Sequence, residues 1–140
     1  MIDQKLVLAP MLVVVGVTFV GFVRLLVARA AASKEIDVSY YSTYRDGREP
    51  EPAWLAARHW SNLFELPTVF YAACLTAYVT GAVTPAALAC AWGFAIGRVG
   101  QSLVHLTTNR LYLRGLAFIL SVLFLFGLWV QLAIAILGAA

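Results

Sequence analysis

Charged and amide side chains recur at helical spacing inside stretches that are otherwise hydrophobic. Arg58, Asn62 and Glu65 follow one another at intervals of four and three residues, so they share one face of a helix. A charge inside a bilayer is costly, and it usually faces a bundle interior or a watery cavity and marks a functional site. This face is therefore a candidate site for an anionic ligand. The alternative is a charge-paired helix interface without a ligand.

The next hydrophobic stretch repeats the pattern. Arg98, Gln101, Ser102 and His105 are spaced at i, i+3, i+4 and i+7, which again places them on one helix face. A lone histidine in such a stretch is more often a buried structural residue than a ligand contact. Its place in a polar stripe makes His105 a candidate ligand residue. Arg110, a few residues later, is interpreted as an anchor that snorkels to the membrane edge.

Positive charge exceeds negative charge among these candidates. Arg24 lies in the first hydrophobic stretch, and Arg114 begins the last one. Together with Arg58 and Arg98 they outnumber Glu65, the single acid of the set, by three. The imbalance predicts an anionic occupant, reached from the cytoplasm beside an apolar cleft open to lipid. Arg24 is equally compatible with a side chain that snorkels to the membrane edge.

The elements that position these residues are expected to be membrane helices. Hydrophobic residues make up 62% of the 140 residues and charged residues 12%, whereas a soluble domain is about half apolar and a quarter charged. A spanning helix needs about 20 mostly apolar residues. The sequence predicts one all-α transmembrane domain over residues 1–140, an integral membrane four-helix bundle. Its helices are expected at 6–32, 54–80, 85–106 and 116–137.

The connections between these helices predict the orientation of the chain. The second connection is short, with Gly81 ending one helix and Thr84 capping the next ahead of Pro85. Lys and Arg are concentrated in the first and third connections; those of the first are Lys34, Arg45 and Arg48. Because cytoplasmic loops are rich in these residues, loop 33–51 is expected in the cytoplasm and both termini outside. The N-terminal apolar run exceeds the about 7–15 residues of a signal peptide, so a retained first helix is expected.

Two classes of site have no support in the sequence. Cys74 and Cys90 lie in apolar segments, without a CxxC motif or a Cys/His cluster, so no metal site is expected. The net charge is +3, but the basic residues fall at segment ends and in loops. No basic run with interleaved aromatic residues occurs, so nucleic-acid binding is not expected either.

The residues on the second predicted helix carry a resemblance to a known family. The stretch from Arg58 through Asn62 to Glu65, followed by Pro67, resembles the RxxxNxxE signature of the MAPEG family, the membrane-associated proteins of eicosanoid and glutathione metabolism. Gly97, Arg98 and Val99 resemble the family's third helix, and Arg24 and Arg114 fall near its arginines in the first and fourth helices. The resemblance spans all four helices, and the chain is identified as a bacterial-type member.

The resemblance implies a fold, an assembly and a set of site residues. Four-helix protomers would form a homotrimer that binds glutathione as co-substrate between neighbouring subunits, in a cleft open to the cytoplasm and the bilayer. Arg114 would be the catalytic residue, because a guanidinium favours the thiolate over the thiol. The residues that would bind glutathione are Arg24, Arg58, Asn62, Glu65, Arg98, Gln101 and His105.

The function implied is that of a glutathione-dependent transferase or peroxidase in the bacterial inner membrane. Its glutathione thiolate would attack a lipophilic electrophile that enters from the bilayer. Some positions differ from the family's enzymes: the chain has His105, Gln101, Gly115 and Phe118 in place of tyrosine, histidine, serine and tyrosine. The family also contains a non-catalytic lipid-binding member. The alternatives are therefore a non-catalytic protein that binds a lipid or small anion, and a purely structural bundle with paired internal charges.

Overall fold

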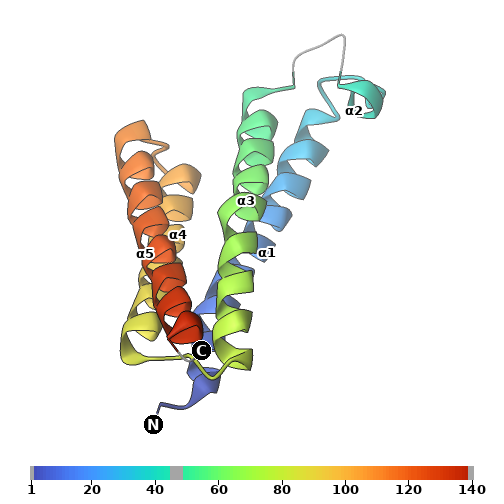
Figure 1. Cartoon of the computed structure of the whole chain (residues 1–140). Coiled ribbons are helices and arrows are strands. Elements are labelled where there is room, and N and C mark those ends of the chain that lie inside the picture. The colour runs from blue at the N-terminus through green and yellow to red at the C-terminus, as the bar shows by residue number, and fades with distance from the viewer. Residues whose placement is uncertain (1, 45–48, 139–140) are drawn as a thin grey trace. The chain divides into compact units, whose positions relative to one another are not determined.

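The regular elements of the chain are helices, as the sequence predicts. The structure is a computed structural model and describes residues 2–44 and 49–138 (Figure 1). In chain order, the elements are η1 (Gln4–Val7), α1 (Leu8–Ala32), α2 (Tyr40–Thr43), α3 (Glu51–Val79), α4 (Pro85–Leu106) and α5 (Leu111–Leu137). The all-α class and the four long helices are confirmed. Arg45 and Arg48, which carry part of the orientation argument, lie outside the described residues.

The helix bounds differ from the predicted ones mainly at N-termini. α4 has the predicted bounds, whereas α3 begins at Glu51 rather than 54 and α5 at Leu111 rather than 116. Pro52 lies in the first turn of α3, where its missing N–H leaves no hydrogen bond unmade. Arginine is a strong helix former, so Arg114 extends α5 in the N-terminal direction and does not precede the helix.

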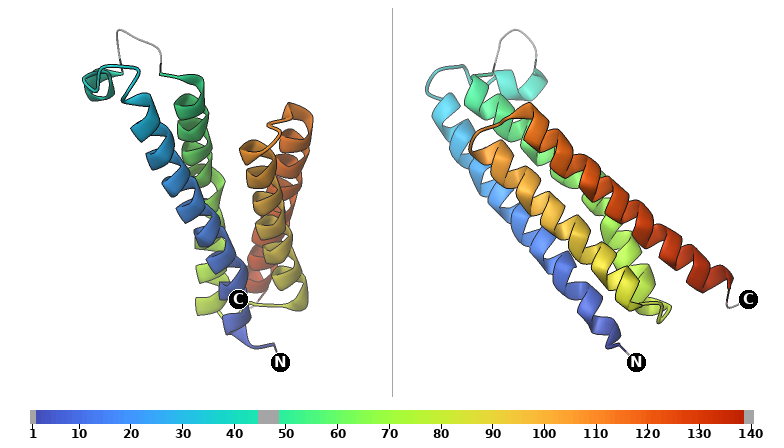
Figure 2. Two further views of the ribbon diagram at one scale, coloured as in Figure 1. Left: turned by 180° about the vertical axis from the view of Figure 1, so that it is seen from behind. Right: turned by 90° about the vertical axis from the view of Figure 1, so that its left-hand side faces the viewer.

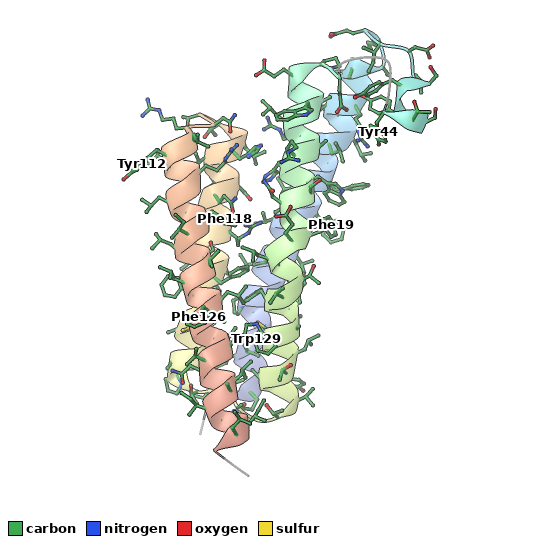
Figure 3. All side chains as sticks on the ribbon, turned by 45° about the horizontal axis from the view of Figure 1, so that its top comes forward. Phe19, Tyr44, Tyr112, Phe118, Phe126 and Trp129 are labelled. Carbon is green, nitrogen blue, oxygen red and sulfur yellow. The ribbon has the colours of Figure 1, made fainter. Side chains whose placement is uncertain are left out.

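Three helices of the described chain are long and apolar enough to cross a membrane. They are Gln4–Ala32, which consists of η1 and α1, and the helices α4 and α5. Large apolar side chains such as Phe126 project from the outer side of α5 (Figure 3), where 68% of the Phe126 surface is exposed. α3 is also long, with 29 residues, but the polar face from Arg58 to Glu65 makes it less apolar. The three apolar helices indicate an integral, multi-pass membrane protein.

The chain divides into two compact units, which are described separately. The first consists of Met1–Val17 and Glu65–Ala140, and the second of Thr18–Phe64. In the first unit α4 and α5 lie side by side (Figure 2). The Phe70 and Phe94 rings stack in its core, with their centroids 4.2 Å apart. The buried apolar residues around this pair are Val7, Val14, Ala73, Cys74, Ala77, Val83, Ala87, Ala91, Ala95, Leu125, Leu128 and Leu132.

The turn between α3 and α4 has the caps that the sequence predicts. Gly81 has a φ of +68°, a left-handed conformation that glycine adopts without steric cost at the end of a helix. The Thr84 side chain accepts a hydrogen bond of 3.0 Å from the Ala87 N–H and so caps α4. The side-chain oxygen of Gln4 accepts a 2.8 Å bond from the Val83 N–H, which ties the N-terminus of the chain to this turn.

Close packing between α4 and α5 depends on two glycines of α4, Gly93 and Gly97. A Cβ atom on Gly93 would lie 2.5 Å from the Phe124 ring, and one on Gly97 would collide with the Ser121 hydroxyl. Gly100, in contrast, has no atom within 4 Å of a built Cβ in the described chain. Small residues let helix backbones approach closely in membranes, so Gly93 and Gly97 set the distance between α4 and α5.

We expect Gly93→Ala to destabilise the fold, by roughly 1–3 kcal/mol, because the new methyl group overpacks the contact with Phe124. The measurement is the unfolding free energy in mixed detergent micelles. Gly16→Ala is the matched control, since Gly16 is exposed on α1 and has nothing within 4 Å of a built Cβ. The control should be neutral or gain stability from helix propensity. Equal stability of the two variants would contradict this account of the α4–α5 contact.

In the second unit the C-terminal half of α1 lies beside the N-terminal half of α3 (Figure 1). A Cβ on Gly21 would lie 2.5 Å from the Leu63 side chain, so the two helices are in close contact there. His59, whose ring lies beside Gly21, is 3% exposed. The packing of small and apolar residues thus fixes the face of α3 that meets α1.

The described part of the connection between α1 and α3 includes a short helix. It contains α2, which ends at Tyr44 with a φ of 55°. The Arg29 guanidinium lies 3.6 Å from the Glu49 carboxylate and 5.1 Å from the Tyr41 ring centroid, and Arg29 Nη2 donates to the Tyr44 hydroxyl at 3.3 Å. Burial, followed by the nearby Glu49 carboxylate, raises the pKa of Tyr41. This cluster fastens the loop to the end of α1.

Candidate functional site

The predicted polar stripe on α4 is buried in the first unit. Arg98 is 1% exposed, and Gln101 and His105 are also buried. The Arg98 Nη1 atom donates to the Gln101 side-chain oxygen at 2.5 Å, and the Arg98 charge interacts electrostatically with Glu65 and Tyr71 of α3. A buried guanidinium needs hydrogen-bond acceptors and opposite charge to offset its desolvation. Gln101 supplies an acceptor and the exposed Glu65 carboxylate supplies opposite charge, so these three predicted site residues interact within the first unit.

Arg114 contacts polar side chains at the C-terminal end of the α4 stripe. Arg114 lies in the first turn of α5 and is half-buried. Its Nη1 atom donates to the side-chain oxygen of Asn109 at 2.8 Å and lies 3.3 Å from His105 Nδ1. Because a guanidinium has only donors, a hydrogen bond here requires the tautomer in which His105 Nδ1 accepts and Nε2 carries the proton. Both acceptors are uncharged, so the guanidinium keeps its full positive charge.

The other edge of the Arg114 guanidinium has no hydrogen-bond partner within the described residues. The contacts with His105 and Asn109 both involve Nη1, which leaves the three N–H groups of Nε and Nη2. This edge has the fork geometry that binds carboxylate and other anions through two parallel hydrogen bonds. The start of α5 adds to the positive potential, since no side chain caps the helix.

Three predicted site residues belong to the second unit. Arg24 and Asn62 are half-buried, and Arg58 is exposed with its guanidinium 5.9 Å from the Trp54 ring centroid. No ion pair between Arg58 and Glu65 is found within the described residues, and Glu65 interacts electrostatically with Arg98 of α4. Seven residues of α-helix rise by about 10.5 Å, too far for two side chains to meet unless both extend along the axis.

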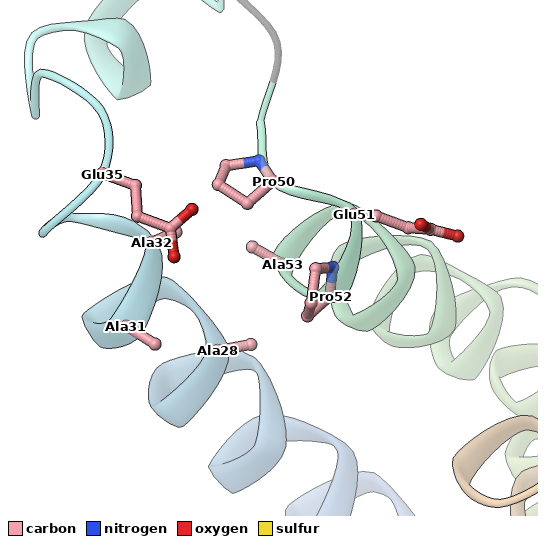
Figure 4. A pocket seen from close by; sticks show the side chains of 8 residues that line it. All are labelled: Ala28, Ala31, Ala32, Glu35, Pro50, Glu51, Pro52 and Ala53. Atoms are coloured by element: carbon pink, nitrogen blue, oxygen red, sulfur yellow. The ribbon is translucent and has the colours of Figure 1, made fainter.

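A pocket in the second unit is separate from all the predicted site residues. It has a volume of about 380 Å³ at the loop end of α1 and α3 (Figure 4). Its floor is made of alanines, and the Glu35 carboxylate lies at its edge opposite Pro50. The lining residues are Ala28, Ala31, Ala32, Glu35, Pro50, Glu51, Pro52 and Ala53. Its acidic edge does not suit the anion that the arginines predict.

Comparison with known protein families agrees with the arrangement of these residues along the four long helices. The sequence model of the MAPEG family matches residues 7–134. The chain belongs to the MAPEG family. No curated protein and no solved structure matches it. Membership places the chain among membrane proteins that include glutathione-dependent transferases and peroxidases, and glutathione is the co-substrate typical of the MAPEG family.

Two residues that contact the candidate site were not assigned a role from the sequence. Tyr71 interacts with Arg98 and lies six positions beyond Glu65 on the same helix. Asn109 binds Arg114, although it lies between two helices and outside both polar stripes. A Thr-Thr-Asn run after a helix is a signal for a helix end, but it does not reveal which side chain the asparagine binds. In residues 2–44 and 49–138, no group of three His, Cys, Asp or Glu is placed to hold a metal.

Proposed function

We propose that this MAPEG protein is an integral membrane glutathione-dependent transferase or peroxidase that acts on lipophilic electrophiles. The observation that carries the proposal is the Arg114 guanidinium, held on one edge by His105 and Asn109 and open on the other. A fixed cation at the start of a helix favours the anionic form of a thiol beside it. The three candidate spans support a location in the bilayer, where a lipophilic substrate would dissolve.

The reaction begins with loss of the glutathione thiol proton to water, because Arg114 stabilises the thiolate that remains. In a transferase, the thiolate sulfur forms a bond to an electrophilic carbon, and the leaving group departs with its electron pair. In a peroxidase, the sulfur attacks a hydroperoxide oxygen and releases an alcohol, and a second glutathione reduces the product to glutathione disulfide and water. Both routes need a stabilised thiolate, so the proposal depends on Arg114 rather than on the electrophile.

The remaining predicted residues are assigned to glutathione binding. Arg98, Gln101 and His105 present polar groups along α4, and Glu65 carries a negative charge suited to the glutathione amino group. Arg24, Arg58 and Asn62 are assigned to glutathione binding by their match to the family's signature and helix arginines. We propose that the site is completed in a homotrimer, since several arginines then share polar groups of neighbouring subunits. A mass of three chains in mild detergent would support this assembly.

The test of the function is a calorimetric titration of the purified protein with glutathione, followed by ultraviolet absorbance of the thiolate. We expect saturable binding and a thiolate band at neutral pH. S-methylglutathione, which has no thiol proton, is the control and should bind without the band. If glutathione binds without the thiolate band, as S-methylglutathione does, the catalytic proposal is contradicted.

The alternative is a non-catalytic MAPEG protein that binds a lipid or a small anion. It is supported by Gly115 and Phe118, which supply no hydroxyl group after Arg114 in the first turns of α5. Native mass spectrometry that retains a lipid, together with failure of the glutathione titration, would favour this function. The guanidinium edge would then bind a phosphate or carboxylate headgroup.

We further propose that the whole chain is one transmembrane domain with α3 as its fourth span, in a bacterial inner membrane. Loop 33–51 would lie in the cytoplasm and both termini outside, since Lys34 and Arg29 lie at the loop end of α1 and Arg110 and Arg114 at the third connection. A cysteine placed at Ser42, in a chain whose two native cysteines are replaced, should resist a membrane-impermeant maleimide in intact cells. Labelling of this cysteine from outside the cell would show that the orientation is the opposite of the proposed one.

A further inference from the structure

We infer that Asn109 is a positioning residue for Arg114: its backbone conformation directs its side-chain oxygen to one edge of the guanidinium and leaves the other edge for an anion. The inference rests on the proposed function of Arg114. It assigns a specific role to a residue between α4 and α5 that neither the polar stripes nor the family signature includes.

The backbone at Asn109 makes this contact possible. Its φ is 45°, in the left-handed region, which asparagine adopts more readily than most residues with a side chain. Its N–H donates to the Val104 carbonyl at 2.7 Å, which completes the end of α4. The peptide is thereby fixed, and the short Asn109 side chain meets Arg114 at 2.8 Å. The same residue therefore ends one helix and holds a side chain of the next.

The chemistry of the two acceptors explains why asparagine suits the position. An amide oxygen and a neutral imidazole nitrogen orient Nη1 without cancelling its charge. A carboxylate at the same place would orient it equally well but would form an ion pair with it. The guanidinium would then attract a second anion less strongly. Asn109 thus combines a fixed orientation with an undiminished charge.

Two substitutions at Asn109 separate orientation from charge. Asn109→Gly tolerates the left-handed backbone and removes the acceptor, whereas Asn109→Asp keeps an acceptor and adds a negative charge. The first readout is the rate at which phenylglyoxal modifies Arg114 in the full-length protein, followed by mass spectrometry without glutathione. Arg110, exposed at the N-cap of α5, is the internal control. We expect several-fold faster modification of Arg114 in Asn109→Gly and a wild-type rate in Asn109→Asp.

The second readout is the pH dependence of the thiolate band of bound glutathione. We expect its apparent pKa to rise by about half to one unit in Asn109→Gly, a part of the 1–3 units that a nearby opposite charge gives. It should also rise in Asn109→Asp, although Arg114 is held. The thermal midpoint should stay close to that of the wild type in both variants, because each residue is compatible with a positive φ. If a variant loses stability and the pH profile of the thiolate band does not change, Asn109 only ends α4 and does not position Arg114.

The two readouts keep the inference distinct from the proposed function. If the wild type forms no thiolate but Asn109→Gly still exposes Arg114 to phenylglyoxal, the positioning role stands and the glutathione function fails. If the wild type forms the thiolate and Asn109→Gly changes neither readout, the positioning role is overturned and the function remains.

Discussion

Arg114→Ala removes the thiolate of bound glutathione and leaves the fold nearly intact. The side chain is half-buried in the first turn of α5, and its polar contacts in the described chain are those with His105 and Asn109. Both partners lie at the end of α4, at the predicted membrane edge, where water can hydrate them after truncation. The thiol of bound glutathione should then return to a pKa of about 8.5, the ordinary value for a cysteine thiol. The thiolate absorbance at neutral pH is the measurement.

Arg110→Ala is the matched control for this variant. It removes the same charge four positions earlier, from an exposed side chain at the N-cap of α5. We expect it to retain the thiolate band, since the effect requires the guanidinium held by His105 and Asn109 rather than net charge at the membrane edge. Arg114→Lys keeps the charge but presents no planar fork, so it should restore only part of the signal. A full thiolate signal in Arg114→Ala would show that the assigned role is wrong.

The helices and their polar faces could be predicted because both follow from local sequence patterns. The end of α3 at Gly81 and the start of α4 at Thr84 are confirmed, since backbone conformation and side-chain caps act within a few residues. Burial of Arg98, Gln101 and His105 follows from their common helix face. The early start of α5 was missed because a charged residue was taken as a helix boundary although arginine favours helix.

The contacts between elements could not be read from spacing alone. The pairing of Glu65 with Arg98, and not with Arg58, depends on which face of α3 meets α4. The contact of Asn109 with Arg114 depends on the path of the chain from α4 into α5, where Asn109 has a φ of 45°. Three-dimensional packing decides both, whereas a periodic pattern determines only which residues share a face.

Glu65→Ala should lower both stability and glutathione binding, because it removes the opposite charge from a buried cation. Arg98 is 1% exposed, and Gln101 supplies it with a hydrogen bond but no negative charge. Breaking a buried pair by removing one partner costs roughly 3–5 kcal/mol. We expect a loss of unfolding free energy near the lower end of this range, since the Glu65 side chain is exposed in the single chain. The measurement is the unfolding free energy in mixed detergent micelles. The control is Glu35→Ala, which removes an exposed carboxylate of the first loop and should change the unfolding free energy by less than about 0.5 kcal/mol.

The double variant Glu65→Ala/Arg98→Met shows whether the stranded charge is the cause. Methionine fills much of the arginine volume without a charge, so the double variant should be more stable than Glu65→Ala alone. Independent sites would instead give additive losses, and the double variant would then be the least stable of the three. Additivity would mean that Arg98 is stabilised without Glu65. Glutathione binding should remain weak in the double variant even when stability recovers, because the carboxylate assigned to the glutathione amino group is still absent.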